Sequence, residues 1–366
     1  MSGSRQKTVS ISAISGGYTG SLNKGLDRFT TLLAGGFDGV DITERDPFRN
    51  SAVAAGVAEV NSSKLHSLKR AINIVSDPDQ NQYNVVTIPG VTIPAATNYL
   101  LEKTEERGDA LAIIDLEKIY TADTENTSSS ADRNSFTIKQ ATDALKARNI
   151  NNSYGAAYAP WVQIQDTISN RLIWAPPSIA ALGALSSNDR VAAPWFAPAG
   201  FTRGGLSEGA AGLPVLDVSK RLSSEDRDDL YEAGINPIAK FPAEGIVIFG
   251  QKTLQQTASA LDRINVRRLL VFLKREISFI ASRLLFAQNN QDTWNRFLQQ
   301  ATPVLESVKA QFGIDDFRLI LDETTTTPDL VDRNIIYSKL IVKPTRSAEF
   351  FAIDFVITNS GAAFED

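Results

Sequence analysis

The chain has 366 residues, a formal net charge of −5 and no cysteine. This length can hold two domains with separate cores, and a composition of 43% apolar and 22% charged residues is that of a globular protein. The absence of cysteine excludes disulfide frameworks, thiolate metal sites and cysteine nucleophiles, and the negative charge argues against a general nucleic-acid binder.

Neither a membrane helix nor a secretory signal is predicted. Charged residues bound even the apolar run 269–273, and the N-terminus lacks the apolar core of a signal sequence. We therefore expect a soluble protein that is not exported by that route.

Strands and helices are predicted to alternate through the first half of the chain. Buried-strand patterns at 83–88 and 110–115 flank a helical pattern at 97–107, and this order is typical of a βαβ unit in a parallel sheet. The serine-rich stretch 123–133 is predicted to be a surface loop. Further strands are expected over 8–14 and 153–162, and further helices over 26–33, from 62 or 63 to 72, over 136–148 and over 178–185.

The second half is predicted to be α+β. Its strongest pattern is a long helix whose apolar stripe starts at Leu269 or Leu270 and continues to Leu284 at spacings of three and four residues. A second helix is expected over 292–312, and strands over 246–249, 317–321 and 334–342.

The character of the sequence changes at about 217–221, so we predict two domains. Residues 8–218 would form an α/β domain with a mostly parallel or mixed sheet flanked by helices. Residues 219–366 would form an α+β C-terminal domain with a long helix and a small antiparallel sheet.

The last strong pattern is a strand over 349–358. Alternate residues of a strand share one face, and the four on this face are all apolar: Phe351, Ile353, Phe355 and Ile357. Such a strand can pair within its own molecule or with a neighbouring molecule.

The sequence offers no credible catalytic, cofactor or metal site. His66 is the only histidine, it lies in a predicted helix, and no Gly-x-Ser-x-Gly elbow is present, so a serine triad is not expected. A single histidine also argues against a zinc or iron site. The glycine clusters at 16–20 and 35–39 lack the Gly-Lys-Ser/Thr of a phosphate loop and are interpreted as turns. The acidic pairs of the second half lack calcium-loop spacing and are interpreted as solvated surface.

Basic residues gather on or beside the long predicted helix. They are Arg263, Arg267, Arg268, Lys274, Arg275 and Arg283. The plain interpretation is a solvated back of the helix. The functional interpretation is an electrostatic contact with an acidic surface of a partner protein.

Several motifs together resemble the contractile tail sheath proteins of phages. In chain order, they are Gly-Gly-x-Asp-Gly at 35–39, an approximate Val-Pro-Gly strand end at 87–90, Ala-x-Tyr-x-Pro-Trp at 156–161, Pro-Pro-Ser at 176–178, Ala-Pro-Ala-Gly at 197–200, a Gly-Ile-Asn turn at 234–238 and the opening of a long helix at 265–268. Each motif alone is weak, but the series covers nearly the whole chain in the order found in that family.

The resemblance implies an α/β sheath domain, sometimes called subtilisin-like, followed by a C-terminal sheath domain that faces an inner tube. Such subunits polymerise helically around the tube and contract to drive it through a target cell envelope. The implied partners are other sheath subunits, the inner tail tube protein, and the baseplate and tail terminator proteins, with no nucleic acid and no membrane. The implied location is the virion, after assembly in the host cytoplasm.

Two alternatives stay open from the sequence. One is the same fold serving a bacterial contractile injection or secretion system. The other is a hydrolase with a degenerate site on a subtilisin-like fold, which would need converging carboxylates with a perturbed pKa in a pocket. We expect no enzyme activity and no cofactor.

The resemblance also gives expectations for particular residues. The tube-facing candidates are Arg267, Arg268, Lys274 and Arg275, and the intersubunit strand candidates are Phe351, Ile353, Phe355 and Ile357. The N-terminal arm usual in the family is not found before Thr8, which indicates a chain trimmed at that side. We therefore expect 348–358 to pair with 334–342 of its own chain and to leave part of the sheet edge open for strands from other chains.

Overall fold

The computed structural model describes residues 63–120, 137–166, 170–207 and 214–349, all of which belong to one compact unit spanning residues 44–366. The predicted strand at 8–14, helix at 26–33 and loop at 123–133 lie outside the described residues, as does the terminal segment from residue 350 onward. Among the residues that are described, no helix is both long and apolar enough to cross a membrane.

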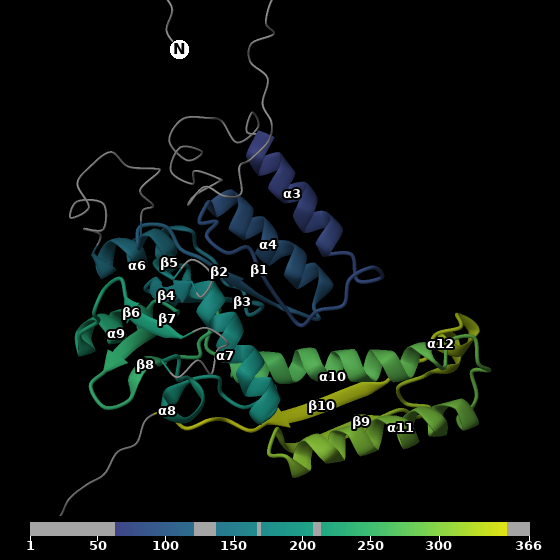
Figure 1. The fold of residues 1–366 in the computed structure, drawn as a ribbon. Coiled ribbons are helices and arrows are strands. Elements are labelled where there is room, and N and C mark those ends of the chain that lie inside the picture. The colour runs from purple at the N-terminus through teal and green to yellow at the C-terminus, as the bar shows by residue number, and fades with distance from the viewer. Residues whose placement is uncertain (1–62, 121–136, 167–169, 208–213, 350–366) are drawn as a thin grey trace, which may run out of the picture. The chain divides into compact units, whose positions relative to one another are not determined.

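A five-stranded mixed sheet organises the first part of the fold (Figure 1). Its strands, in spatial order, are β1 (Val85–Thr87), β2 (Leu111–Ile114), β3 (Gly155–Ala159), β7 (Ile235–Phe241) and β8 (Gly245–Ile248). The first four run parallel, and β8 pairs antiparallel with β7 at the edge. β2 and β3 are buried along their whole length, which explains why their sequences are continuous apolar runs. The predicted mixed sheet is confirmed.

Helices cover both faces of this sheet. They are α3 (Ser63–Val75), α4 (Pro94–Arg107), α6 (Ile138–Ala147), α7 (Pro177–Val191), the short α8 (Gly200–Arg203) and α9 (Ser224–Glu232). Alternate residues of β2 enter two different cores: Leu111 and Ile113 share a core with α7, whereas Ala112 and Ile114 share a core with α4, α6 and α9. The period of two in a strand thus places helices on both sides.

A smaller antiparallel sheet packs on the α7 side. Its strand order is β5 (Arg171–Ala175), β4 (Val162–Asp166) and β6 (Val215–Val218). Val162 and Ile164 of β4 belong to the same core as α7, so this sheet closes one side of the α/β half.

The C-terminal part contains the two long helices and the small antiparallel sheet that the sequence predicts. Its elements are the 3₁₀ turn η2 (Ala260–Asp262), α10 (Ile264–Ser282), α11 (Gln291–Ala310), β9 (Ile314–Ile320), α12 (Pro328–Asp332) and β10 (Lys339–Pro344). β9 and β10 pair antiparallel, and Figure 1 shows α10 and α11 beside this pair. Leu269 and Leu273 of α10 share a core with Leu305 of α11 and with Trp195 of the α/β half.

The domain boundary predicted between residues 218 and 219 precedes two strands of the five-stranded sheet. β7 and β8 follow that position in the chain, yet β7 pairs with β3 and β8 pairs with β7. Sheet pairing thus connects residues on both sides of the predicted boundary, as far as Ile248.

Candidate functional site

Helix α10 directs basic side chains toward the α/β half of the chain. Arg268 is 3% exposed, and its Nη2 donates a hydrogen bond of 2.5 Å to Oδ2 of Asp189 on α7. Arg267 is 6% exposed, its guanidinium lies 3.9 Å from the centroid of the Tyr154 ring, and it donates a hydrogen bond to Oγ of Ser153. Each buried cation is thus held by groups outside its own helix, as the burial of charge requires.

Two exposed cations continue this arrangement along α10. Nζ of Lys274 donates to the backbone oxygen of Arg107 at the end of α4 over 3.2 Å, and Nη2 of Arg275 donates to Oε1 of Gln82 over 3.4 Å. Exposed contacts of this kind contribute little individually. We call the set Arg267, Arg268, Lys274 and Arg275 the basic seam, because all four side chains join α10 to the α/β half.

The expectation that the whole basic seam faces a tube is corrected for two of its members. The charges of Arg267 and Arg268 are covered by residues of their own chain, so neither offers a free cation to a second protein. Lys274 and Arg275 are exposed, so contact with a tube stays a prediction for these two residues. Arg283, from the wider basic set, stacks on Phe279 with 4.2 Å between the guanidinium and the ring centroid.

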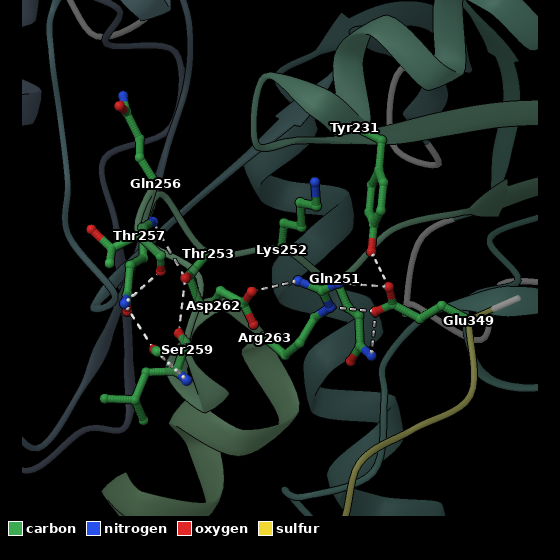
Figure 2. Close-up of polar contacts among 12 residues, drawn as sticks. Tyr231, Gln251, Lys252, Thr253, Gln256, Thr257, Ser259, Asp262, Arg263 and Glu349 are labelled. Atoms are coloured by element: carbon green, nitrogen blue, oxygen red, sulfur yellow. Dashed lines mark hydrogen bonds and ion pairs between the residues drawn. The ribbon is translucent and has the colours of Figure 1, made fainter.

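A second polar cluster anchors the segment that follows β10 (Figure 2). The Glu349 carboxylate accepts hydrogen bonds from Nε and Nη2 of Arg263 at 2.6 and 2.9 Å, from the Tyr231 hydroxyl at 2.7 Å and from Nε2 of Gln251 at 3.1 Å. Burial by itself would raise the pKa of this carboxyl, but the hydrogen bonds from Arg263, Tyr231 and Gln251 hold the pKa below its usual value. We call these four residues the Glu349 anchor. The anchor joins α9, the stretch after β8 and the start of α10 to one carboxylate.

The anchor takes the chain toward the α/β half and away from β10. β10 ends at Pro344, and the described residues 345–349 form no strand. Glu349 therefore does not pair with 334–342, which corrects the start of the pairing predicted for 348–358. The remainder of that segment lies outside the described residues, including the candidates Phe351, Ile353, Phe355 and Ile357.

The described residues do not bring histidine and carboxylate side chains together in a group that could hold a metal ion. His66 lies at an exposed position on α3. Within the described ranges, no group of three or more histidine or carboxylate side chains could hold a metal ion. That the protein holds no metal and is not an enzyme stays a prediction.

The carboxyl of Asp115 has a raised pKa, and its surroundings are structural. Asp115 follows β2, is 1% exposed, and accepts hydrogen bonds from the Gly90 amide at 2.8 Å, the Ser178 amide at 3.2 Å and the Ser178 hydroxyl at 2.7 Å. Burial raises the pKa of Asp115 to about 6, while these hydrogen bonds act in the opposite direction. Asp115 joins the end of β2 to the first turn of α7 and offers no surface to a substrate.

Sequence reasoning missed Asp189, Tyr231 and Glu349. None of them belongs to a recognisable motif, and each binds a residue far away in the chain. Asp189 lies 79 residues from Arg268, Tyr231 lies 118 residues from Glu349, and Glu349 lies 86 residues from Arg263. The only available signal was the wider basic set, because buried arginines require acidic or polar partners somewhere in the fold.

Together, the fold and its polar clusters define a protein with an α/β part and an α+β part, in which buried charges hold elements together. The chain belongs to the phage tail sheath family. The model of the phage tail sheath protein central domain matches residues 69–254, and the model of the phage tail sheath C-terminal domain matches residues 256–358.

Individual relatives agree with this family. The chain is 36% identical to the tail sheath protein of Vibrio phage KVP40 and 32% identical to that of Enterobacteria phage T4, in each case over 218 residues that make up 60% of this chain and 32% of the relative. The chain thus spans about a third of the length of these relatives. The solved sheath complex of an extracellular contractile injection system, PVC, in its contracted state shares the fold with a TM-score of 0.62 and 19% identity, covering 90% of this chain and 97% of that chain.

Proposed function

We propose that the chain is a structural subunit of a contractile phage tail sheath, which polymerises helically around an inner tube. Contraction of the sheath would drive the tube through the target cell envelope and so permit ejection of the viral genome. The observation that carries this proposal is the presence of both sheath domains, one directly after the other, over residues 69–358. The mechanical role needs no catalytic centre, so we propose that the protein is not an enzyme.

The partners follow from this role. They would be other sheath subunits, the inner tail tube protein, and the baseplate and tail terminator proteins. The location would be the virion, after assembly in the host cytoplasm. Head-to-tail contacts that do not close into a ring can propagate as an open helix, which suits a sleeve of identical subunits.

Three candidate contacts are proposed. β9 and β10 form a sheet of only two strands, so each has one edge without a strand partner among the described residues. Such an edge can accept a strand from a neighbouring chain. Lys274 and Arg275 remain the candidates for contact with the tube. The apolar face of Phe351, Ile353, Phe355 and Ile357 remains the candidate for strand exchange between subunits.

We also propose a domain boundary near residue 255 in place of 218/219. The family models meet between residues 254 and 256, and β8 ends the five-stranded sheet at Ile248. A domain boundary at this point would place β7 and β8 in the same domain as the other strands of their sheet.

A bacterial contractile injection or secretion system is the second candidate function. The fold shared with the PVC sheath favours it. The sequence relatives at 32% and 36% identity are phage tail proteins, so we place the phage tail first. The hydrolase has no support from the described residues, since Asp115 is buried and tied to Ser178.

The deciding experiment is negative-stain electron microscopy of the protein, purified alone and after co-expression with a candidate inner tube protein. Tubular polymers or sheathed tubes are expected. Failure to form any helical polymer with or without tube, from protein that is folded by circular dichroism, would contradict the proposal.

The tube contact is tested with the double variant Lys274→Glu, Arg275→Glu. Both side chains are exposed, so the fold should persist while sheath is recovered with less tube, and the loss should be larger at low salt. Lys139→Glu, at an exposed position on α6, is the matched control. Unchanged tube recovery in the double variant would remove Lys274 and Arg275 from the contact.

A further inference from the structure

A cavity of about 660 Å³ opens beside the Glu349 anchor, and the last described residues of the chain form part of its wall. Residues 345–349 line one side. The α/β half supplies the other side, with Phe196 and Arg203 near α8, Arg227 on α9 and Phe249 after β8. The chain segment after Glu349 therefore starts at the rim of this cavity.

The wall of the cavity continues into an exposed aromatic surface. Phe249 is 42% exposed and its ring centroid lies 5.6 Å from that of Phe201, which is 50% exposed. Phe241 contacts both rings, at 5.2 and 5.1 Å. Exposed phenylalanine rings that touch one another form an apolar patch of the kind that another segment usually covers. We call Phe196, Phe201, Phe241 and Phe249, with Arg203 and Arg227, the aromatic groove.

The aromatic groove is also basic. The guanidinium of Arg227 lies 5.0 Å from the ring centroid of Phe241 and 5.9 Å from that of Phe249, and the guanidinium of Arg203 lies 5.2 Å from that of Phe196. Arg346 adds a third cation to the lining, against the single acidic side chain of Asp228. Glu349 does not add free negative charge, because Arg263 neutralises it. The groove thus favours an occupant that is aromatic and acidic.

The residues after Glu349 have this chemistry. Phenylalanine or isoleucine stands at 350, 351, 353, 355 and 357, and the charged residues of 350–366 are all acidic: Asp354, Glu365 and Asp366. An extended chain advances about 3.3 Å per residue, so the stretch 350–357 can span roughly 26 Å from the anchor. No linker is needed to bring it to the groove, because Ala348 and Glu349 already line the cavity.

We propose that the aromatic groove binds the segment 350–358 of its own chain while the subunit is free. The Glu349 anchor fixes the point from which the segment leaves, the phenyl rings accept its apolar side chains, and Arg203 and Arg227 attract Asp354. A segment held in this way is withheld from strand pairing with another chain until it is released. The contact belongs to the single subunit, so it does not rest on the proposed sheath function.

The test uses the full-length chain, in which Phe355 is replaced by the photo-crosslinking residue p-benzoylphenylalanine, at a concentration where it is monomeric. After irradiation, mass spectrometry is expected to find crosslinks within one chain to residues of the aromatic groove. The charge-reversal variant Arg227→Glu should lower the yield of these crosslinks about fivefold. Phe279→Ser, which alters an exposed phenylalanine on α10, should leave the yield unchanged.

Three results would overturn the proposal. They are crosslinks to 339–344, which would mean pairing with β10, crosslinks only between two chains, and no crosslinks at all. Arg227 is half-buried on the surface of α9, and circular dichroism checks that its variant is folded. If it is not, Phe201→Ser tests the same surface at a more exposed position, and retention of the full crosslink yield there would equally contradict the proposal.

Discussion

Arg268 on α10 and Asp189 on α7 form an ion pair of 2.5 Å in which the arginine is almost fully buried and the aspartate is partly exposed. Asp189 lies in the range that matches the central sheath domain and Arg268 in the range that matches the C-terminal sheath domain, so the pair joins the two. Its role is therefore to fix the long helix against the α/β half. The same helix reaches that half again through Tyr154, Arg107 and Gln82.

Replacing Asp189 should destabilise the fold. Asp189→Ala leaves the buried Arg268 without its carboxylate, and we expect the free energy of unfolding to fall by about 2–3 kcal/mol, measured by urea denaturation. The matched control is Asp329→Ala, which breaks the exposed pair with Arg333 and should change stability by less than about 0.5 kcal/mol. Equal effects of the two substitutions would show that the seam is not a stabilising contact.

Asp115 predicts a specific dependence of stability on pH. Its pKa in the folded chain, about 6, is raised above the usual value of 3.8, so its contribution to stability is fully present below pH 4 and is lost as pH rises through 6. The shift corresponds to about 3 kcal/mol between the two limits. Asp115→Asn cannot ionise, so the stability of the wild type minus that of the variant should fall between pH 4 and pH 7.

Denaturation of both proteins at several pH values measures this difference, because the other titrating groups largely cancel. Asp79→Asn, at an exposed position, controls for replacing a carboxylate as such. A difference that stays constant from pH 4 to pH 7 would mean that Asp115 does not ionise in this range.

Two neighbouring glycines should differ sharply in their tolerance of a methyl group. A Cβ on Gly204 would lie 2.6 Å from the backbone oxygen of Ile248 and 2.8 Å from that of Gly200, whereas a Cβ on Gly205 meets nothing within 4 Å. We expect Gly204→Ala to cost about 2–3 kcal/mol of stability and Gly205→Ala to cost less than about 0.5 kcal/mol. Thermal or urea unfolding compares the two, and similar costs would contradict the close approach of this turn to β8.

The Glu349 anchor should hold residues 345–349 in place at neutral pH. In Glu349→Gln the ion pair with Arg263 is lost, and amide hydrogen exchange in peptides covering 345–349 should accelerate while exchange in β7 stays unchanged. Because the folded pKa of Glu349 is lowered, the anchor is intact above the usual value of 4.5 and is lost as pH falls through the folded value. Glu323→Gln, at an exposed position, is the control. Identical exchange in all three proteins would contradict an anchoring role.

Local patterns were sufficient to predict much of the fold. The continuous apolar run of β2, the stripe of α10 and the order of small motifs identified the mixed sheet, the long helix and the family. They could not reveal the partners of each element. The position of β7 in the first sheet depends on pairing with β3, about 80 residues earlier in the chain, and no local signal encodes that pairing.

The same limit applies to the site. The sequence shows that α10 is basic on one side, but a solvated face, a partner-binding face and a buried seam have the same spacing of arginines. Only the fold brings Asp189 to Arg268 and Tyr154 to Arg267 and so decides the question for these two residues. For Lys274 and Arg275, exposure leaves the contact with a partner as a prediction.

The basic seam has a mechanical consequence. Helix α10 contacts the α/β half at several points along its length. A force applied to the far end of the α10–α11 hairpin is therefore transmitted to the α/β half and its five-stranded sheet. Swinging the hairpin would first have to break a buried ion pair. The α10–α11 hairpin and the α/β half are therefore expected to move as one rigid unit, with little bending between them.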